Sequence, residues 1–406
     1  MDRRSFLQNS SAFAGLSALG LAGCDRRIAA PTVAGAPSLP FYDLPGPLIP
    51  IRADVDRIFR ITVCLRPFRA AGPRMDVERV GDKLVVHNYG HGGSGWSLSW
   101  GAAQVATASA LTALDGNREL AVIGCGALGL TAAITAQRAG LKVTIYAKER
   151  APYTRSSRAT GSWTTDSRIA LTSAAAPDFA ARWESMARAS FFMYQSFLGM
   201  PGSPIEWTDR YSLTDESPEQ RTAQREQSDH HGFIHLNSRI ADLTPRPQQL
   251  PPGATNFPTK FVSRNTSMTF NVADYSRQLL NDFLVAGGAI ETREFHTPVD
   301  LAMLPQRVIV NSTGYAARQL WSDESIVPVR GQIAWLIPQE GVNYGINYGT
   351  LNVLARRDGI VIQPSPGGED FGWNDDNETP DRAAAEAGVR ELQALYNRMS
   401  PSAKKT

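Results

Sequence analysis

The sequence predicts an α/β fold class, with a Rossmann-like dinucleotide-binding domain and a second α+β domain built on a mixed sheet. A buried strand at 120–123 passes through a glycine-rich turn into a helix at 128–139, and a strand at 141–147 follows. Such a strand–helix–strand unit forms a right-handed parallel crossover. The second domain is predicted because residues 326–375 contain further β-strand patterns, while residues 176–260 are polar, rich in proline and typical of an α+β region with long loops.

The composition excludes several other classes of protein. Of the 406 residues, 42% are hydrophobic and 20% are charged, so the chain can bury a sizeable core. Three cysteines cannot form a disulfide scaffold, and a net charge of +2 argues against nucleic-acid binding driven by bulk charge. No Cys/His run has the spacing of a zinc site, and no segment has the roughly 20 apolar residues of a membrane-spanning helix.

Residues 1–24 are predicted to be an export signal. Arg3 and Arg4 precede Ser-Phe-Leu, and an apolar stretch from 11 to 23 leads into Cys24 within a Leu-Ala-Gly-Cys sequence. These features resemble a twin-arginine signal and a bacterial lipobox. We therefore expect export of the folded protein to the periplasm and a lipid anchor to a membrane at Cys24. Residues 25–50, rich in Pro, Ala and Gly, are expected to form a tether.

The elements after the tether follow in order. Hydrophobic patterning predicts strands at 61–65 and 84–87, a glycine-rich loop at 88–95 and a buried helix at 102–114. Beyond the crossover unit it predicts a helix at 272–287, strands at 289–295, 307–311, 332–337 and 359–363, and an amphipathic helix at 382–399.

The turn from Gly124 to Gly129 has the glycine spacing of a dinucleotide-binding loop. Its first glycine permits a tight turn, the second lets the backbone approach a pyrophosphate, and the third allows close packing of helix and strand. Gly126, Ala127 and Leu128 then present the free N–H groups of a helix N-terminus to the anion. Glu149, 20 positions after Gly129, is a candidate to bind a ribose hydroxyl. This turn alone does not separate NAD from FAD.

A second glycine-rich loop indicates which of the two cofactors, NAD or FAD, the chain binds. Residues 87–101 read His-Asn-Tyr-Gly-His-Gly-Gly-Ser-Gly-Trp-Ser-Leu-Ser-Trp-Gly. The backbone of such a loop can lie flat against a ring system, and the helix after it can face partial negative charge. This segment resembles the flavin loop of the D-amino-acid oxidase family. The resemblance implies FAD as the cofactor, with contacts from Gly92, Gly93, Ser94, Gly95, Trp96 and Ser97.

Four further segments resemble the same family. Residues 65–69, Leu-Arg-Pro-Phe-Arg, resemble its substrate-carboxylate segment, with Arg66 at the critical position. Residues 153–163 resemble the stretch after the second strand, 310–314 the strand that ends over the cofactor, and 327–332 the turn that follows. The resemblance implies further FAD contacts from Arg155, Ser156, Gly161, Ser162, Phe295, Thr313 and Gly314.

The order of these segments differs from that of the family. There the Gly-x-Gly-x-x-Gly turn is N-terminal and the arginine segment and flavin loop are C-terminal, whereas here residues 55–114 precede the turn. We interpret this order as a circular permutation, closed by a short joint at 114–119. The predicted FAD-binding domain comprises 51–165 and 272–322, and the predicted substrate domain comprises 166–271 and 323–400.

The resemblance also implies a reaction. An amino acid would place its carboxylate on Arg66 and its amine on the carbonyl of Gly93, with Tyr344 and Tyr348 as candidates for a lid. The Cα–H would leave as a hydride to flavin N5. The imino acid would hydrolyse to a 2-oxo acid and ammonia, and oxygen would reoxidise the flavin to give hydrogen peroxide. No side-chain nucleophile or metal is needed.

Several alternatives stay open at this point. A dehydrogenase that passes electrons to a membrane carrier is favoured by the predicted lipid anchor, and a catalytically silent, anchored flavoprotein is a third reading. An NAD-dependent enzyme is disfavoured by the flavin loop. Taken alone, Arg66 is typical of a structural ion pair, and only the flavin loop reverses that interpretation. His91 is interpreted as structural, and Cys64 and Cys125 as buried thiols. The side-chain specificity, electron acceptor and oligomeric state are left open.

Overall fold

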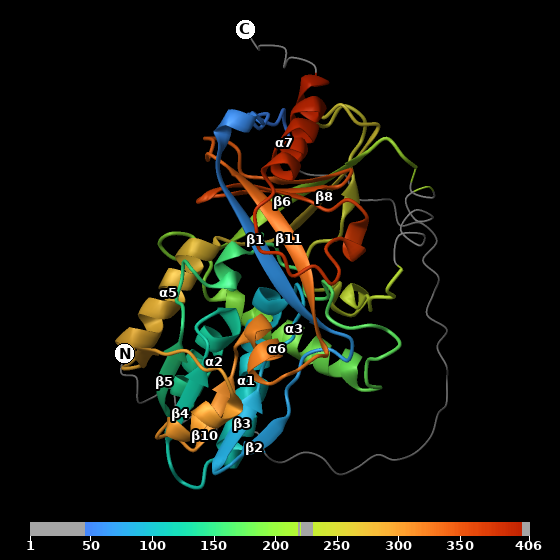
Figure 1. The fold of residues 1–406 in the computed structure, drawn as a ribbon. Helices are drawn as coiled ribbons and strands as arrows, with labels where there is room; N and C mark the ends of the chain where they lie inside the picture. Colours follow the sequence, from blue (N-terminus) through green and yellow to red (C-terminus); the bar gives the residue numbers. More distant parts are fainter. Residues whose placement is uncertain (1–44, 218–219, 221–229, 400–406) are drawn as a thin grey trace, which may run out of the picture. The chain divides into compact units, whose positions relative to one another are not determined.

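The structure, a computed structural model, describes residues 45–217, 220 and 230–399. The predicted export signal and most of the predicted tether therefore lie outside the described residues. The described residues belong to one compact unit that contains two β-sheets (Figure 1). The predicted α/β fold class, with a mixed second sheet, is confirmed.

The smaller sheet has six strands in the order β2-β3-β10-β4-β5-β9. Neighbouring strands from β3 to β9 are parallel, and β2 is antiparallel at one edge. Both faces of a parallel sheet are covered, so its strands are hydrophobic almost throughout. The strands are β2 (Val77–Val80), β3 (Lys83–His87), β10 (Val308–Asn311), β4 (Glu119–Ile123), β5 (Lys142–Ala147) and β9 (Ala289–Thr292).

Helices cover both faces of this sheet. On one face, α1 (Gly95–Ala113) and α2 (Ala127–Arg138) pack against each other, with α3 (Phe179–Gln195) beside α1 and α5 (Val272–Val285) beside α2. On the other face, Leu301 of η4 (Pro298–Met303) and Leu320 of α6 (Ala317–Leu320) pack with Ala121 and Ile123 of β4. Because side chains alternate along a strand, the intervening Leu120 and Val122 join the core beneath the helices.

The larger sheet has eight strands in the order β1-β11-β14-β13-β12-β6-β8-β7. All neighbours are antiparallel except β12 and β6, which are parallel, so the sheet is mixed. The long β1–β11 ribbon runs from this sheet towards the smaller one (Figure 1). The strands are β1 (Ile58–Arg69), β11 (Ile326–Leu336), β14 (Gly359–Pro364), β13 (Leu351–Arg356), β12 (Gly345–Tyr348), β6 (Ile205–Thr214), β8 (Phe261–Phe270) and β7 (Gln248–Gln249).

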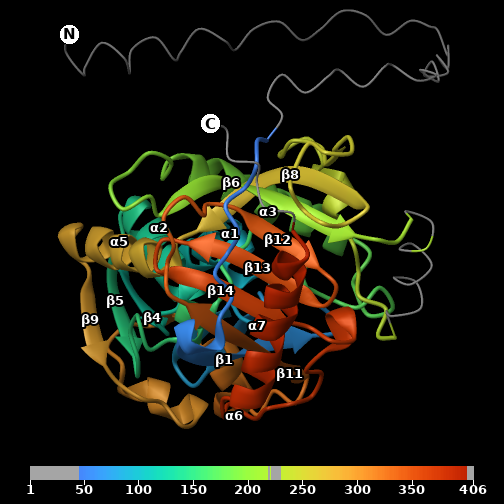
Figure 2. The ribbon, with the colours of Figure 1, turned by 90° about the horizontal axis from the view of Figure 1, so that it is seen from above.

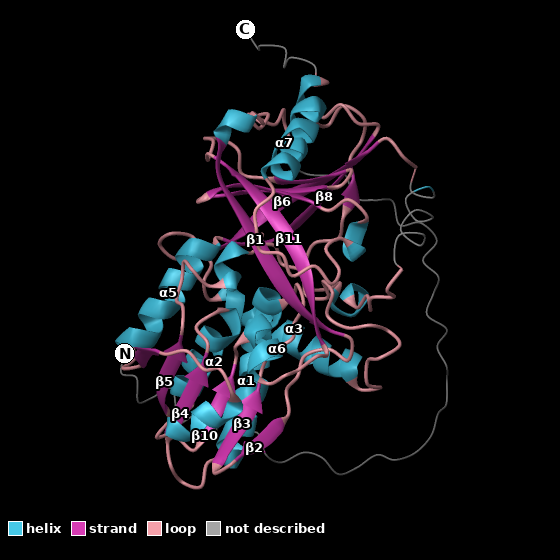
Figure 3. Ribbon diagram, viewed as in Figure 1, coloured by secondary structure: helices cyan, strands magenta, loops and turns pink. Residues whose placement is uncertain are grey.

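Helix α7 (Arg382–Asn397) packs over β11 and β14 of the larger sheet (Figure 2). It begins at Asp381, whose side chain accepts a hydrogen bond of 3.0 Å from the backbone N–H of Ala384. This N-cap satisfies a backbone donor that the first helical turn leaves free. Short 3-10 helices fall in the connections (Figure 3): η1 (Val55–Arg57), η2 (Arg155–Arg158), η3 (Asn237–Ile240), η5 (Gly314–Ala316) and η6 (Gly368–Asp370).

The structure corrects three sequence-based assignments. β1 joins the larger sheet, so the prediction that 51–165 belongs wholly to the FAD-binding domain is wrong for that strand. α3 packs on α1, so part of the predicted substrate domain at 166–271 covers the smaller sheet. α1 begins at Gly95 rather than at residue 102, so the helix follows the glycine-rich loop directly. Among the described helices, none combines the length and apolar character needed to cross a bilayer.

Candidate functional site

A cavity of about 900 Å³ is bounded by both sheets. Its walls come from the loop before α1, the turn before α2, the stretch after β5 and the end of β10, all from the side of the smaller sheet. The larger sheet contributes residues of β1, β11, β13 and β14. The cavity therefore joins the carboxyl ends of parallel strands, where α/β proteins bind ligands, to the face of a mixed sheet.

The backbone around the turn between β4 and α2 leaves no room for a side chain at Gly124 or Gly129. Gly124 has φ +102°, and a Cβ there would lie 2.5 Å from the carbonyl oxygen of Ser312. A Cβ on Gly129 would lie 2.0 Å from the carbonyl oxygen of Gly124, so this glycine sets the packing of helix on strand. The backbone N–H of Ala127 donates to Ser156 Oγ at 3.1 Å. The backbone of the turn thus lines the cavity directly, as a close approach to a phosphate requires.

The loop before α1 is held against two neighbouring segments. The N–H of Gly92 donates to the carbonyl of Pro67 at 2.9 Å, and that of Gly93 donates to the carbonyl of Ser167 at 2.9 Å. Gly92 has φ +53°, and a Cβ there would lie 1.8 Å from the carbonyl oxygen of Arg168. Only glycine fits this position. The loop is therefore fixed between β1 and the stretch 161–170.

His91 is buried at the cavity wall with 1% of its surface exposed. Neither of its ring nitrogens has a hydrogen-bond partner among the described residues. Burial lowers the pKa of His91 to about 3, so the ring is neutral at physiological pH. A buried imidazole without a partner is costly unless a ligand supplies one. This pair of nitrogens therefore points to a polar ligand in the cavity.

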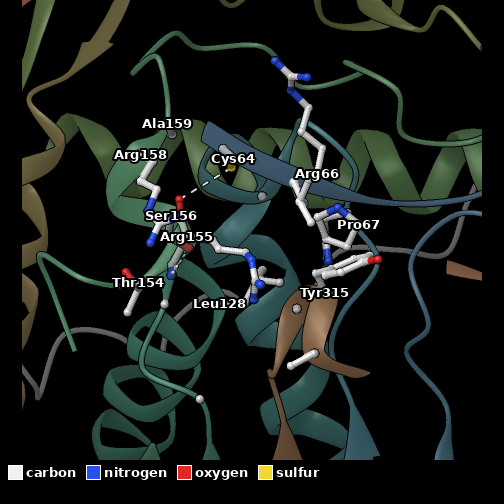
Figure 4. Close-up of a pocket in the computed structure, with 18 of the residues that line it drawn as sticks. Cys64, Arg66, Pro67, Leu128, Thr154, Arg155, Ser156, Arg158, Ala159 and Tyr315 are labelled. Atoms are coloured by element: carbon white, nitrogen blue, oxygen red, sulfur yellow. Dashed lines mark hydrogen bonds between the residues drawn. The ribbon is translucent and has the colours of Figure 1, made fainter. Parts of the chain in front are cut away.

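Arg66 lies on β1 and is one of the residues that line the cavity (Figure 4). Its Nη1 donates only to backbone carbonyls, of Val329 at 3.4 Å and Arg330 at 3.2 Å. Burial lowers the pKa of this guanidinium. A Cβ on Gly331 would lie 2.3 Å from Arg66 Nη2, so the guanidinium rests against bare backbone. Among the described residues, its Nε and Nη2 groups have no hydrogen-bond partner. Most of the N–H groups of this guanidinium can therefore bind an anion.

Two more arginines lie on the stretch after β5. The guanidinium groups of Arg155 and Arg158 both bind the carboxylate of Glu378. The carbonyl of Arg155 accepts a hydrogen bond of 3.6 Å from Cys64 Sγ (Figure 4). Burial raises the pKa of this thiol. Cys64 was expected to be a simple buried thiol, and the structure corrects this by placing it on the cavity wall.

Most of the residues predicted for the site meet in this one cavity. The turn residue Gly129 and the loop residues Ser94 and Ser97 stand behind the wall: Ser94 Oγ donates to the Ser167 carbonyl at 3.3 Å, and Ser97 Oγ accepts from the Thr164 N–H at 2.8 Å. The predicted residues on the wall are Arg66, Gly92, Gly93, Gly95, Trp96, Gly124, Gly126, Ala127, Leu128, Glu149, Arg155, Ser156, Gly161, Ser162, Phe295, Thr313 and Gly314.

The two predicted lid tyrosines do not line the cavity. Tyr344 is 2% exposed, and its hydroxyl lies 2.7 Å from the carbonyl of Ile49 and 2.9 Å from the hydroxyl of Tyr396. Tyr348 accepts a hydrogen bond from Arg398 at 3.0 Å. Both hydroxyls are thus engaged around α7, which corrects the expectation of a lid. Sequence spacing could not place them, because it does not give the register of β12.

The structure also adds residues that the sequence did not single out. Ser167 and Arg168 line the cavity beside the glycine loop, and Asn352 of β13 and Gln363 of β14 line it from the larger sheet. These positions lack a local motif, so no sequence signal marks them. In the described part of the chain, no group of three or more His, Cys, Asp or Glu residues is arranged to hold a metal ion.

Comparison with known proteins shows which proteins this chain is similar to. Residues 119–405 match a protein family described as FAD dependent oxidoreductase. A D-amino-acid oxidase of Rubrobacter xylanophilus is 28% identical over 282 residues, which cover 68% of this chain and 77% of that protein. A D-aspartate oxidase of Talaromyces thermophilus is 46% identical over 56 residues, which cover 12% of this chain and 15% of that one. The crystal structure of iminodiacetate oxidase from Chelativorans sp. BNC1 has a TM-score of 0.49 at 14% identity, covering 69% of this chain and 79% of that one.

Proposed function

We infer the function from the premise that this chain belongs to the family of FAD-dependent oxidoreductases. Its cofactor is FAD. The wall of the cavity suits that cofactor for two reasons. Glycine backbone without side chains lines the cavity both at the β4–α2 turn and at the glycine loop. His91 also has two ring nitrogens that lack a hydrogen-bond partner among the described residues. The turn at Gly124–Leu128 would hold the pyrophosphate, Glu149 a ribose hydroxyl, and the loop at Gly92–Trp96 the flavin.

We propose that the chain oxidises a D-amino acid, or a related acid that bears an amine, with oxygen as the electron acceptor. The observation that carries this proposal is Arg66, a cavity guanidinium whose described partners are two backbone carbonyls. A guanidinium binds a carboxylate through two parallel charge-assisted hydrogen bonds. Arg66 lies beside the glycine loop, because the carbonyl of the neighbouring Pro67 accepts a hydrogen bond from the N–H of Gly92.

The reaction is a two-electron oxidation. Arg66 would hold the carboxylate of the substrate, and the carbonyl of Gly93 would accept a hydrogen bond from a neutral amine. FAD supplies the oxidising equivalent when bound. The substrate would lose two electrons and two protons to become an imino acid, which water hydrolyses to a 2-oxo acid and ammonia. Oxygen takes up the electrons and protons as hydrogen peroxide.

Anaerobic titration of the FAD-loaded protein tests this proposal. We expect D-amino acids, but not their L-enantiomers, to bleach the visible absorbance of the flavin. In Arg66→Met the flavin stays bound, while the half-saturating substrate concentration rises by at least about 30-fold, because one partner of a charge pair is lost. Arg182→Met, which removes an exposed guanidinium that pairs with Asp178 on the surface, is the matched control.

The outcomes separate the candidate functions. If no amino acid bleaches the flavin, or if Arg66→Met bleaches as readily as the parent, the proposal fails. Bleaching followed by rapid recovery in air supports an oxidase. Bleaching that air does not reverse contradicts the oxygen-dependent step and leaves the dehydrogenase that uses a membrane carrier.

A further inference from the structure

We propose that the cavity selects an amino acid with a second carboxylate, and that Arg168 binds this second group while Arg66 binds the first. The inference rests on the proposed function and deepens it, because it names the class of side chain that the site accepts. It assigns a substrate-binding residue that no sequence pattern marked.

Arg168 is a buried cation on the same cavity wall as Arg66. It is 8% exposed. Its guanidinium donates to the backbone carbonyls of Glu369 at 2.6 Å and Gly368 at 3.3 Å and to Ser167 Oγ at 3.4 Å. Among the described residues, no carboxylate oxygen forms an ion pair with Arg168 or with Arg66. By contrast, the buried guanidinium of Arg356 is paired with Asp358 at 2.6 Å.

The acidic side chains of the cavity are committed elsewhere or lie at the other end of it. Glu378 binds Arg155 and Arg158, Glu294 pairs with Lys148 at 2.7 Å, and Glu324 pairs with Arg318 at 2.7 Å. The fourth, Glu149, follows β5 and is the candidate for the ribose. None of these four carboxylates pairs with Arg66 or Arg168. Glu369 and Asp370 also favour the charged form of Arg168, but among the described residues they lie within ion-pair distance of His235 and His231 rather than of Arg168. The two guanidinium groups beside the loop are therefore suited to an anionic ligand.

The two cations also act on each other. Burial is the main cause that lowers the pKa of Arg168, to about 9, and the charge of Arg66 is the next. The opposing influence of either Glu369 or Asp370 is smaller than that of Arg66. Arg210 is another buried arginine without a carboxylate partner in the described residues, but it does not line the cavity. Two like charges on one cavity wall repel, and a ligand with two negative groups relieves this.

The position of Arg168 assigns it to the substrate rather than to the pyrophosphate. The glycine loop lies between the two arginines: Gly92 donates to Pro67, next to Arg66, and Gly93 donates to Ser167, next to Arg168. The backbone of Arg168 itself excludes a Cβ at Gly92. The phosphate-binding turn is instead joined to Ser156, by the hydrogen bond from Ala127. Both cations thus flank the segment whose Gly93 carbonyl would accept the substrate amine.

Pairs of nearly isosteric substrates test the inference. We expect D-aspartate to reduce the flavin anaerobically with a ratio of limiting rate to dissociation constant at least about tenfold above that of D-asparagine, and D-glutamate likewise above D-glutamine. In Arg168→Met this preference disappears. Arg168→Lys keeps part of the preference, because it keeps the charge but loses the fork. Arg182→Met leaves the preference unchanged.

Each outcome bears on one proposal. If D-alanine reduces the flavin but the acids have no advantage over their amides, or if Arg168→Met keeps the advantage, this inference is overturned and the proposed function stands. If no amino acid reduces the flavin, the proposed function itself fails. Should Arg168→Met not fold, ligand binding to the parent protein tests the inference. We expect the dissociation constant of succinate, followed by the change in the flavin spectrum, to be at least about tenfold lower than that of butyrate. Equal dissociation constants would overturn the inference.

Discussion

At the level of single residues, burial sets the charge state of the cavity. It keeps His91 neutral, raises the pKa of the Cys64 thiol and lowers that of the Arg66 guanidinium. Arg168 still carries its charge at neutral pH, since its lowered pKa is about 9. The wall therefore offers cations and neutral polar groups beside the glycine loop, a combination suited to an anionic substrate.

His91 gives a prediction for acid stability. Its pKa is lowered to about 3 in the folded protein, whereas an unfolded histidine titrates near 6.5. Between these values the unfolded chain binds more protons, so stability falls as the pH falls. For the FAD-free protein we expect His91 to account for a loss of roughly 2 kcal/mol in the free energy of unfolding between pH 7 and pH 5. His91→Asn should remove that part of the urea-unfolding pH dependence, whereas the exposed His296→Asn should not; equal slopes in all three proteins would contradict this.

At the level of elements, the β4–turn–α2 unit combines a structural role with a binding role. Gly129 lies inside the unit, where a Cβ would strike the backbone of Gly124 at 2.0 Å. Gly126 lies on the cavity wall, where a Cβ would meet only the movable side chain of Ser156, at 2.8 Å. Within one motif, Gly129 therefore allows the helix to pack on the strand, and Gly126 keeps the cavity wall free of a side chain.

Two alanine substitutions separate these roles. Gly129→Ala should lower the free energy of unfolding of the FAD-free protein by at least about 2 kcal/mol, because the helix must move away from the strand. Gly126→Ala should leave that free energy nearly unchanged but weaken FAD binding, because the added methyl group projects where the pyrophosphate is expected. Urea unfolding and FAD titration measure the two effects, and an identical effect of both substitutions in both experiments would contradict the assignment.

At the level of the whole molecule, the two ends of the described fold meet. Asp54 Oδ1 accepts a hydrogen bond of 2.7 Å from Gln393 of α7, and the Ile49 carbonyl is bound by Tyr344 beside Tyr396. The joint at 115–118 between α1 and β4 is exposed. The family match begins at residue 119, immediately after this joint. We therefore propose that the chain is a circular permutation of the family order, because a surface joint and adjacent ends make such an exchange compatible with one fold.

Restoring the family order tests this proposal. A chain that runs from 119 to 399, then through a short Gly/Ser linker into 51–113, should fold and bind FAD with an unchanged visible spectrum. Its free energy of unfolding should differ from that of the parent by less than about 2 kcal/mol, since only loop closure changes. A matched chain opened between Ile309 and Val310 of β10 should not fold, because it cuts a buried strand. A rearranged chain that is soluble but binds no FAD would count against the proposal.

The sequence by itself determined the elements whose structure depends only on local sequence patterns. The β4–turn–α2–β5 unit could be predicted almost to the residue, because glycine spacing, strand hydrophobicity and helix length are local properties. The glycine loop and the resemblance of residues 65–69 and 153–163 likewise led to many of the residues that line the cavity. The export signal and lipid anchor remain predictions, since those residues lie outside the described part of the chain.

Only the tertiary structure decided what depends on long-range pairing. β1 joins β11 across more than 250 positions of sequence, which moves Arg66 onto the larger sheet and opposite the glycine loop. Tyr344, immediately before β12, is turned into the core, while Asn352 of β13 and Gln363 of β14 line the cavity wall. Arg168 lies in a turn that reaches the same loop through the hydrogen bond from the Gly93 N–H to the Ser167 carbonyl. Hydrogen bonds between distant strands fix these positions, and no local pattern in the sequence encodes which partners they find.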